Sequence, residues 1–549
     1  MCLQPHPITP VPEETMRVAR AAFPKGTAYL RLRDELGIFY RDERFAPLFA
    51  QRGRPAEAPW RLALVSVLQF AENLSDRQAA EAVRSRIDWK YLLGLELTDG
   101  GFDYSLLSEF RDRLLAGEAE AVLLDALLAH CQDAKLVRAR GGQRTDATHV
   151  LGAVRVLNRL ECVGEALRHA LNTLAVAAPT WVRAKIPPDW ADRYATRLES
   201  ARLPSSAADR QALARTIGAD GSALLTALWA PTAPGGLREL EAVEVLRQIW
   251  VQQFFLEAGR VHWREEGSLP PASLWINSPY DPEVRYGTKR THTWIGYKVH
   301  LTESCDEDLP HLVTQVATTI ATGTDYGTLP LVQADLAAKD LRPAEHFVDA
   351  GYVDAGLLVR SHAQGIDLVG PVSTAPDWQT RADQGFDQEH FAIDWRTRTA
   401  ICPRGQHSVA WKTNRDRHGE PVIRIEFAQA TCLACPVRAR CTRAATYPRT
   451  LSLRPRPEFE ALRAARARQR TDDFMTRYKQ RAGIEGTLSQ AVRAFDLRHA
   501  RYVGQPKTHL QHVLTAVALN VVRLCAWFGG IPRSQTRVSP FASLFLEAA

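Results

Sequence analysis

Three acidic residues that lie far apart in the chain, Asp146, Asp349 and Glu485, have the types and settings needed for phosphoryl chemistry. Asp146 falls in the strand-like segment RTDATHVLGAV, Asp349 ends the short apolar strand of AEHFVDAGY, and Glu485 lies in the basic segment RYKQRAGIEGTLSQAVR. Ligands at strand ends of an open α/β sheet commonly converge on one crevice. Three carboxylates there repel one another, a repulsion that Mg²⁺ or Mn²⁺ relieves with oxygen ligands. Two such ions clamp the attacking and leaving oxygens of an in-line phosphoryl displacement.

Each acid also has a simpler interpretation when it is taken alone. Asp146 can form a turn, Asp349 can cap a strand end, and Glu485 can pair with the arginines around it. For any single residue the simpler interpretation is favoured, whereas the three acids in this order favour a shared metal site.

The segment around Glu485 places other useful side chains on the same helix face. At 100° per residue, Tyr478, Arg481 and Glu485 fall within an arc of about 60°, and Ser489 lies beside them. Arg481 can hold a phosphate near the metals, and Tyr478 can donate a hydrogen bond or stack.

The segments that carry the acids, TDATHV, EHFVDAGYVDA and YKQRAGIEG, resemble the three carboxylate motifs of bacterial insertion-sequence transposases of the DDE class. YKQRAGIE matches the Tyr-x2-Arg-x3-Glu signature of that family. GYKVHLTE, the C-terminal segment LRHARYVGQPKTHLQHVLTAVALNVVRL and the N-terminal segments LSDRQAAEAV and FDYSLLSEFRDRL are also similar to this family. The resemblance therefore spans most of the chain.

The resemblance implies a ribonuclease H-like catalytic domain in which Asp146, Asp349 and Glu485 bind Mg²⁺ or Mn²⁺ in a two-metal mechanism. It implies a DNA transposase that binds the terminal inverted repeats of its element, cuts the DNA there and joins the freed 3′-hydroxyl to target DNA. Synapsis of two ends implies a homodimer. Two alternatives stay open: a catalytically silent DNA-binding protein or repressor derived from a transposase, and a ribonuclease H-like nuclease without strand transfer.

One position departs from the family signature, which often has a basic residue seven positions after the glutamate. Val492 occupies that position here, and Arg493 follows it. At eight residues from Glu485, Arg493 points about 80° away from it around the helix. Its role as the replacement stays open.

The elements that must position these residues change character along the chain. Alternating β-branched segments at 293–304 and 311–321 predict paired strands, and the later order of strand and helix predicts an α/β sheet covered by helices. The predicted parts are a helical N-terminal DNA-binding domain (1–135), a catalytic domain begun by 136–155 and 271–372, a helical insertion (156–270), a β-rich insertion with cysteines (373–457), and the catalytic helix with C-terminal helices (458–549).

The N-terminal domain has no basic surplus, since residues 61–115 carry seven basic and nine acidic groups. In it, Ser75 can cap a helix after a break at NLSD. The helical pattern fits a helix-turn-helix module and a plain packing domain equally well; only the family resemblance implies a DNA reader.

Positive charge is concentrated near the C-terminal acid. The chain has a net charge of +7, and residues 438–501 hold sixteen Lys or Arg against six Asp or Glu. Such a surplus predicts a polyanionic partner, here double-stranded DNA. Arg493, Arg498 and Arg501 are the candidate DNA-binding residues.

Four of the nine cysteines, Cys402, Cys432, Cys435 and Cys441, fall within forty residues, with His407 between the first two. Four thiolates in a β-rich segment can hold a structural Zn²⁺. An iron–sulfur cluster and four reduced thiols are the alternatives.

The longest apolar run, 512–531, contains Asn520 and Arg523 and predicts a buried helix rather than a membrane span. The first residues lack the pattern of a signal peptide. We therefore expect a cytoplasmic, nucleoid-associated protein with no membrane partner.

Overall fold

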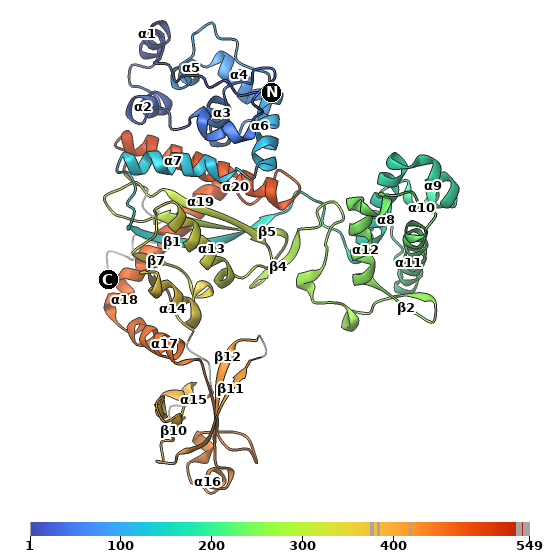
Figure 1. The fold of residues 1–549 in the computed structure, drawn as a ribbon, viewed down its shortest axis with the longest axis vertical. Coiled ribbons are helices and arrows are strands. Elements are labelled where there is room, and N and C mark those ends of the chain that lie inside the picture. The colour runs from blue at the N-terminus through green and yellow to red at the C-terminus, as the bar shows by residue number, and fades with distance from the viewer. Residues whose placement is uncertain (1, 374–377, 382–384, 417–418, 534–540, 542–549) are drawn as a thin grey trace.

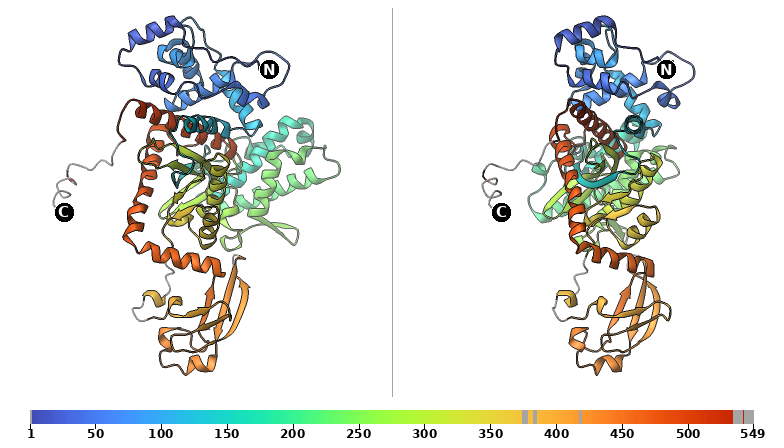
Figure 2. Two further views of the ribbon diagram at one scale, coloured as in Figure 1. Left: turned by 60° about the vertical axis from the view of Figure 1, so that its left-hand side comes forward. Right: turned by 90° about the vertical axis from the view of Figure 1, so that its left-hand side faces the viewer.

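The computed structural model describes residues 2–373, 378–381, 385–416, 419–533 and 541. The fold is mixed α/β, with one central mixed sheet, a helical domain against it, and two lobes that project from the sheet in different directions (Figures 1 and 2). The parts are called the N-terminal domain (2–135), the sheet domain (136–155, 271–372 and 456–533), the helical insertion (156–270) and the cysteine lobe (373–455).

The sheet domain is built on six strands in the order β4-β5-β1-β7-β8, with β6 also paired to β5. β1 is antiparallel to β5 and parallel to β7, and β7 is parallel to β8. The predicted pair of strands at 293–304 and 311–321 is confirmed as β5 and β6. The strands are β1 (Gly142–Leu151), β4 (Arg285–Lys289), β5 (His292–Ser304), β6 (Val313–Ile320), β7 (Glu345–Phe347) and β8 (Asp367–Val369).

Helices cover this sheet. Asp354 caps α14 by accepting a hydrogen bond from the Leu357 amide at 2.7 Å. The helices are α13 (Asp325–Ala338), η6 (Ala350–Tyr352), α14 (Ala355–Ala363), α17 (Arg456–Gln469), α18 (Asp472–Tyr478), η9 (Lys479–Ala482), α19 (Gly483–Phe495) and α20 (Gln505–Phe528).

The N-terminal domain consists of helices joined by short turns. Ser75 caps α4 in a capping box with Gln78, which confirms the predicted helix start. The helices are α1 (Glu13–Ala22), α2 (Ala28–Glu35), η1 (Asp42–Leu48), α3 (Pro59–Ala71), α4 (Asp76–Ser85), α5 (Ile87–Leu93), α6 (Ser105–Ala116) and α7 (Ala121–Asp133).

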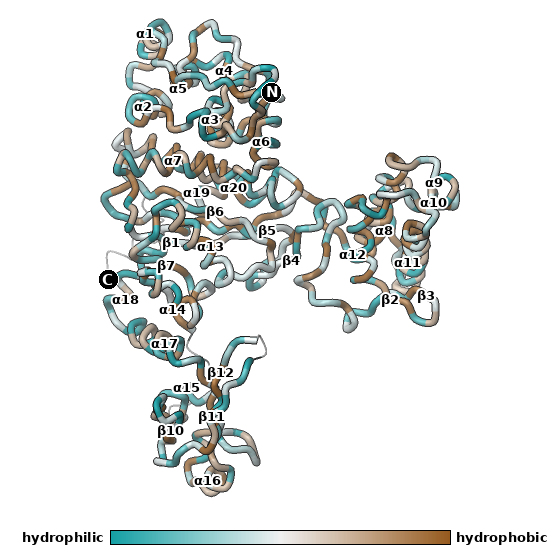
Figure 3. The backbone as a smooth tube through the Cα atoms, viewed as in Figure 1, coloured by the Kyte–Doolittle hydropathy of each residue, from teal (hydrophilic) through white to brown (hydrophobic). Residues whose placement is uncertain are grey.

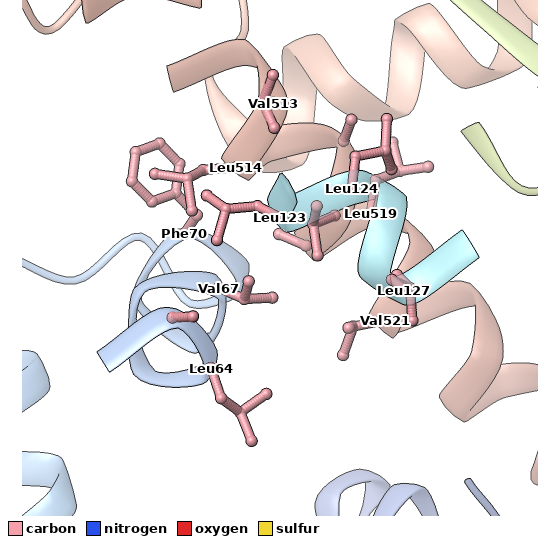
Figure 4. Close-up of a cluster of buried hydrophobic side chains, with 14 of the residues drawn as sticks. Leu64, Val67, Phe70, Leu123, Leu124, Leu127, Val513, Leu514, Leu519 and Val521 are labelled. Atoms are coloured by element: carbon pink, nitrogen blue, oxygen red, sulfur yellow. The ribbon is translucent and has the colours of Figure 1, made fainter. Parts of the chain in front are cut away.

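Helix α20 joins this domain to the sheet. It lies between the N-terminal helices and β6, and apolar residues line α7 and α20 where they run together (Figures 1 and 3). By length and composition α20 could cross a membrane, but 78% of its most apolar window is buried inside the protein. The predicted buried helix is thus confirmed. Its core contacts include Leu64, Val67, Phe70, Leu123, Leu124, Leu127, Val513, Leu514, Leu519 and Val521 (Figure 4).

The helical insertion has a hydrophobic core of its own. The prediction that this segment stays helical up to residue 270 is wrong, because β2 (Phe254–Glu257) and β3 (Arg260–Trp263) form a hairpin. Its two turn residues, Ala258 and Gly259, both have positive φ, as the tight turns favoured in hairpins require. The helices are α8 (Arg159–Ala177), α9 (Pro179–Lys185), α10 (Trp190–Tyr194), η2 (Ser200–Arg202), α11 (Ala207–Trp229), η3 (Leu237–Glu239), α12 (Glu241–Gln253), η4 (Glu266–Ser268) and η5 (Ala272–Leu274).

The cysteine lobe contains the three-stranded sheet β11-β12-β13 and the pair β10-β9. It projects beyond α17, away from the N-terminal domain (Figure 1). Its elements are α15 (Trp378–Arg381), η7 (Gln388–His390), β9 (Ala392–Asp394), β10 (Thr399–Ile401), β11 (Ser408–Arg415), β12 (Pro421–Phe427), α16 (Gln429–Leu433), η8 (Arg438–Arg440) and β13 (Thr450–Leu453).

Candidate active site

Asp146 lies in the middle of β1, at the centre of the sheet, opposite Leu301 of β5. Its side chain is only 10% exposed, and Oδ1 accepts a hydrogen bond from the Ala147 amide at 2.7 Å. Burial raises the pKa of the Asp146 carboxyl; the charge of Asp349 adds to this effect, and Arg481 opposes it. A buried carboxylate beside a second acid therefore depends on a cation for its charge to be stable.

Asp349 follows the end of β7, the parallel neighbour of β1. Arg144 of β1 is paired with Phe347 of β7, and the same register continued by two residues places Asp349 beside Asp146. The Asp349 carboxylate accepts a hydrogen bond from the Gly351 amide at 2.9 Å and so caps η6. The capping role and a role in the site are therefore compatible, because one Asp349 oxygen serves the cap.

Arg481 connects the first and third acids. Its Nη2 donates to Asp146 Oδ2 at 2.6 Å, and its Nη1 donates to Glu485 Oε1 at 2.5 Å. Burial raises the pKa of the Tyr478 hydroxyl, and the charges of Asp349, Asp146 and Glu485 act in the same direction against Arg481. The structure thus gathers all three acids, Tyr478 and Arg481 in one place.

The segment 477–493 is not one continuous helix. α18 ends at Tyr478, a 3-10 turn follows in η9, and α19 begins at Gly483. Tyr478 stacks on Phe474, with ring centroids 5.5 Å apart. A uniform helix predicts that Arg481 and Glu485 share one face. The structure keeps this arrangement, because the two side chains form an ion pair at a spacing of four residues.

A buried ion network fixes this turn to the sheet. Arg144 of β1 donates from Nε to Glu303 Oε1 at 2.6 Å and from Nη1 to the Gln480 carbonyl at 2.7 Å. The third guanidinium nitrogen lies 3.0 Å from Nδ1 of His311. Arg144 is two residues from Asp146 on the same face of β1, so it positions η9 over the acid.

The other oxygen of Glu303 holds α19 and α20. Thr487 donates to Glu303 Oε2 at 2.5 Å, and Arg523 donates to the same oxygen at 2.7 Å. Burial would raise the pKa of the Glu303 carboxyl, but Arg523 and Arg144 hold it below its usual value. At Gly483, a Cβ atom would overlap the Arg144 guanidinium. Glycine is therefore required for α19 to approach the sheet.

A fourth carboxylate, Asp325, also lies beside the site. It lies in the first turn of α13, whose N-cap is Thr324, and it pairs with Lys298 of β5 at 2.9 Å. A Cβ atom on Gly351 would lie 3.0 Å from Asp325 Oδ2 and 3.1 Å from Asp349 Oδ1, so both carboxylates face this glycine. In the sequence, Asp325 and Lys298 are marked only by their positions, Lys298 in a predicted strand and Asp325 in the loop after the next one.

Two of the candidate DNA-binding arginines lie near α19. Arg493 is exposed in its last turn, whereas Val492 packs against the hydrophobic core. Arg498 donates from Nε to Thr148 Oγ1 at 3.0 Å, two residues along β1 from Asp146. Arg498 is therefore on the same face of the sheet as the first acid.

The third arginine, Arg501, contacts the N-terminal domain instead. Its guanidinium donates to Asn73 and lies 4.7 Å from the ring centroid of Phe70. These contacts join the segment after α19 to the end of α3.

The donor set of the site fits a hard divalent cation by its chemistry. Asp146, Asp349 and Glu485 offer only carboxylate oxygens, which Mg²⁺ and Mn²⁺ favour. Among the residues that the structure describes, no group of three or more His, Cys, Asp or Glu side chains is already arranged around a metal position. In the acid site the positive guanidinium of Arg481 stands between two of the acids instead.

The predicted zinc ligands lie elsewhere, in the cysteine lobe. Cys402, Cys432, Cys435 and Cys441 all line one cavity there, together with His407. They form a separate cluster from the acids, which belong to the sheet domain (Figure 1).

Comparison with known families gives two matches. Residues 401–525 match the family described as Transposase DDE domain, and residues 18–113 match the family described as Transposase domain (DUF772). The first match contains Arg481 and Glu485, and neither contains Asp146 or Asp349. No curated protein matches this chain.

Both matched families are transposase families, and they cover the N-terminal domain and the part of the chain that carries the third acid. The two matches support an insertion-sequence transposase of the DDE class. Membership in this class implies a nuclease or transposase enzyme that acts on DNA and generally uses divalent metal ions.

Proposed function

We propose that this protein binds the terminal inverted repeats of its own element, cuts the DNA at the element ends and transfers the strand to target DNA. The observation that carries this proposal is the meeting of the acids. The paired register of β1 and β7 ends two residues before Asp146 and Asp349, the charge of Asp349 raises the pKa of Asp146, and Arg481 links Asp146 to Glu485.

The sheet supports a ribonuclease H-like catalytic domain. Three antiparallel strands, β1, β5 and β6, are continued on the other side of β1 by the parallel strands β7 and β8. The acids come from the central strand, from the end of its parallel neighbour and from a helix packed on the same sheet. This placement is the one that the DDE resemblance implies.

The roles we assign follow from the contacts. Asp146, Asp349 and Glu485 would hold Mg²⁺ or Mn²⁺, which when bound supplies charge stabilisation to both the attacking and the leaving oxygen. Arg481 pairs with both Asp146 and Glu485 in this structure. If these two carboxylates bind metal ions instead, the guanidinium of Arg481 is released from them. A free guanidinium beside the acids can then bind a phosphate oxygen of DNA. Tyr478, on the same side, is placed to orient the DNA backbone.

Two displacements complete the reaction. In the first, water attacks a phosphodiester at the element end, the P–O3′ bond breaks, and the 3′-hydroxyl leaves with the proton it gains. In the second, the oxygen of this hydroxyl forms a bond to the phosphorus of a target phosphodiester, the target P–O3′ bond breaks, and the target 3′-hydroxyl leaves with the proton that the attacking hydroxyl gives up. We propose that the N-terminal domain reads the repeat, that Arg493 and Arg498 contact DNA phosphates, and that two copies of the chain synapse the ends inside a bacterial cell.

The test is incubation of the full chain with Mg²⁺ and a labelled fragment that carries the sequences flanking the gene. The proposal predicts binding, nicking at the element end and a joined product with target DNA. Binding without nicking would instead identify a repressor, and nicking without joined product would identify a nuclease. Glu485→Gln, which keeps the shape of the side chain, should bind the fragment without cutting it.

A further inference from the structure

The four cysteines of the cysteine lobe are separated by up to 39 residues, yet they line one cavity of about 60 Å³. Cys402 follows β10, Cys432 lies in α16, Cys435 follows α16, and Cys441 ends η8. All four are half-buried free thiols.

Each cysteine belongs to a tight backbone turn. The Gly405 amide donates to the Cys402 carbonyl at 2.8 Å, the Cys435 amide donates to the Cys432 carbonyl at 3.4 Å, and the Cys441 amide donates to the Arg438 carbonyl at 2.9 Å. Three separate turns thus direct thiols to the same cavity. Burial of apolar surface alone does not call for this convergence.

The lobe has little else to hold these turns. Its hydrophobic core contains six buried side chains among the described residues, and Cys402, Cys432 and Cys441 pack at the edge of that core. Small units with such a limited core usually need disulfides or a structural metal. None of the four thiols forms a disulfide. The six buried side chains are Phe391, Ala400, Ile425, Phe427, Leu451 and Leu453.

We propose that Cys402, Cys432, Cys435 and Cys441 bind one structural Zn²⁺ that ties β10, α16 and η8 together. Zinc favours four thiolates in a tetrahedron at about 2.3 Å, so binding draws the three turns inward and closes the cavity between them. The thiols lose their protons on binding, which couples folding of the lobe to the metal.

Positively charged side chains near the cysteines would stabilise the negative charge of a zinc ion bound by four thiolates. Four thiolates with one Zn²⁺ carry a net charge of −2, and three arginines, Arg404, Arg438 and Arg449, line the same cavity. Arg438 is anchored by donating to the backbone carbonyls of Ala445 and Tyr447 at 3.2 and 3.1 Å. His407 also lines the cavity but is exposed, and we assign it no ligand role.

The test is elemental analysis of the purified full chain, followed by titration with a thiol-specific mercurial and a zinc-binding dye. We expect about one zinc per chain, released as the thiols react. Replacement by Co²⁺ should give the visible absorption of a tetrahedral thiolate site. Iron in place of zinc, or no metal, would overturn the proposal.

Variants assign the ligands. Cys432→Ser together with Cys435→Ser should remove the zinc, whereas Cys162→Ala, at a buried thiol of the helical insertion, and His407→Ala should retain it. Zinc retained by the double variant would contradict the proposal. If that variant does not fold, the mercurial titration of the unmodified protein decides instead. Asp349→Ala should keep its zinc, so this result is independent of the proposed reaction.

Discussion

The sheet domain and the cysteine lobe are stabilised in different ways. The sheet domain buries ionic and polar groups, among them the Arg144–Glu303 pair, in which Glu303 has no exposed side-chain surface. In the part of the cysteine lobe that the structure describes, six hydrophobic side chains form a buried core, and four thiols line a cavity. The buried network of the sheet domain fixes the acids relative to one another, at the cost of sensitivity to protonation. The cysteine lobe carries none of the three acids, so it does not have to hold catalytic groups in register. Local cross-linking of its turns is enough to stabilise it.

Acid should affect the sheet domain most strongly. Burial lowers the pKa of His300 to about 4 and the pKa of both His346 and His512 to about 3. Unfolding exposes these rings, which then bind protons near pH 6.5, so stability is complete above that pH and falls as the pH drops toward 4 or 3. From pH 7 to pH 5 each ring should cost about 2 kcal/mol.

Urea unfolding at pH 7 and pH 5 measures this loss, with a signal from the sheet domain. The change in the free energy of unfolding with pH should be smaller in His300→Gln, because glutamine keeps hydrogen-bonding groups but does not titrate. Equal stability at the two pH values would contradict the role of the buried rings.

Two glycines of α19 give the next largest effect. Gly483→Ala places a Cβ atom against the Arg144 guanidinium, which is held by Glu303 and the Gln480 carbonyl and cannot easily move. We expect a loss of about 1–3 kcal/mol and a displaced Glu485, with reduced DNA cleavage. Gly486→Ala meets no atom within 4 Å and should stabilise the helix by about 0.5–1 kcal/mol.

Thermal unfolding and the nicking assay together compare these glycine variants. If Gly483→Ala were as stable and active as Gly486→Ala, the close packing of α19 on β1 would not position the third acid. Neither substitution should change the zinc content of the cysteine lobe.

The smallest effects concern the arginines after the acid. Arg493→Ala removes an exposed charge and should weaken DNA binding evenly across sequences, with the salt slope reduced by about one and stability unchanged. Arg501→Ala removes contacts to Asn73 and Phe70 and should instead lower stability by about 0.5–1 kcal/mol. DNA binding at several salt concentrations, with unfolding curves for both variants, separates the two roles; the same loss of DNA affinity in both would show that Arg501 also contacts DNA.

Local sequence patterns predicted several elements of the fold, because alternation identifies β5 and β6 and a capping serine marks α4. It did not predict how distant side chains meet. The pairing of Lys298 with Asp325 and of Arg144 with Glu303 depends on which strand faces are covered, which no local pattern states. The hairpin β2–β3 was missed because its Ala-Gly turn lacks the usual asparagine or aspartate.

The same limit applies within the site. The sequence placed Arg481 and Glu485 on one helix face, and their contact follows from that spacing. It did not show that Arg481 also reaches Asp146, because this contact depends on the 3-10 turn η9 and on the Arg144 bond to Gln480. The sequence also did not show that the guanidinium of Arg501 meets Asn73 of the N-terminal domain; its contact with DNA stays a prediction.

The central claim is that Asp146, Asp349 and Glu485 form one catalytic site, and a matched pair of aspartates tests it most directly. Asp349 and Asp354 lie five residues apart, and both cap a helical turn. In the Mg²⁺-dependent nicking assay on element ends, Asp349→Ala should lose roughly a thousandfold in rate. Asp354→Ala should lose only about 1 kcal/mol of stability and keep its rate. Equal nicking rates in the two variants would contradict the site.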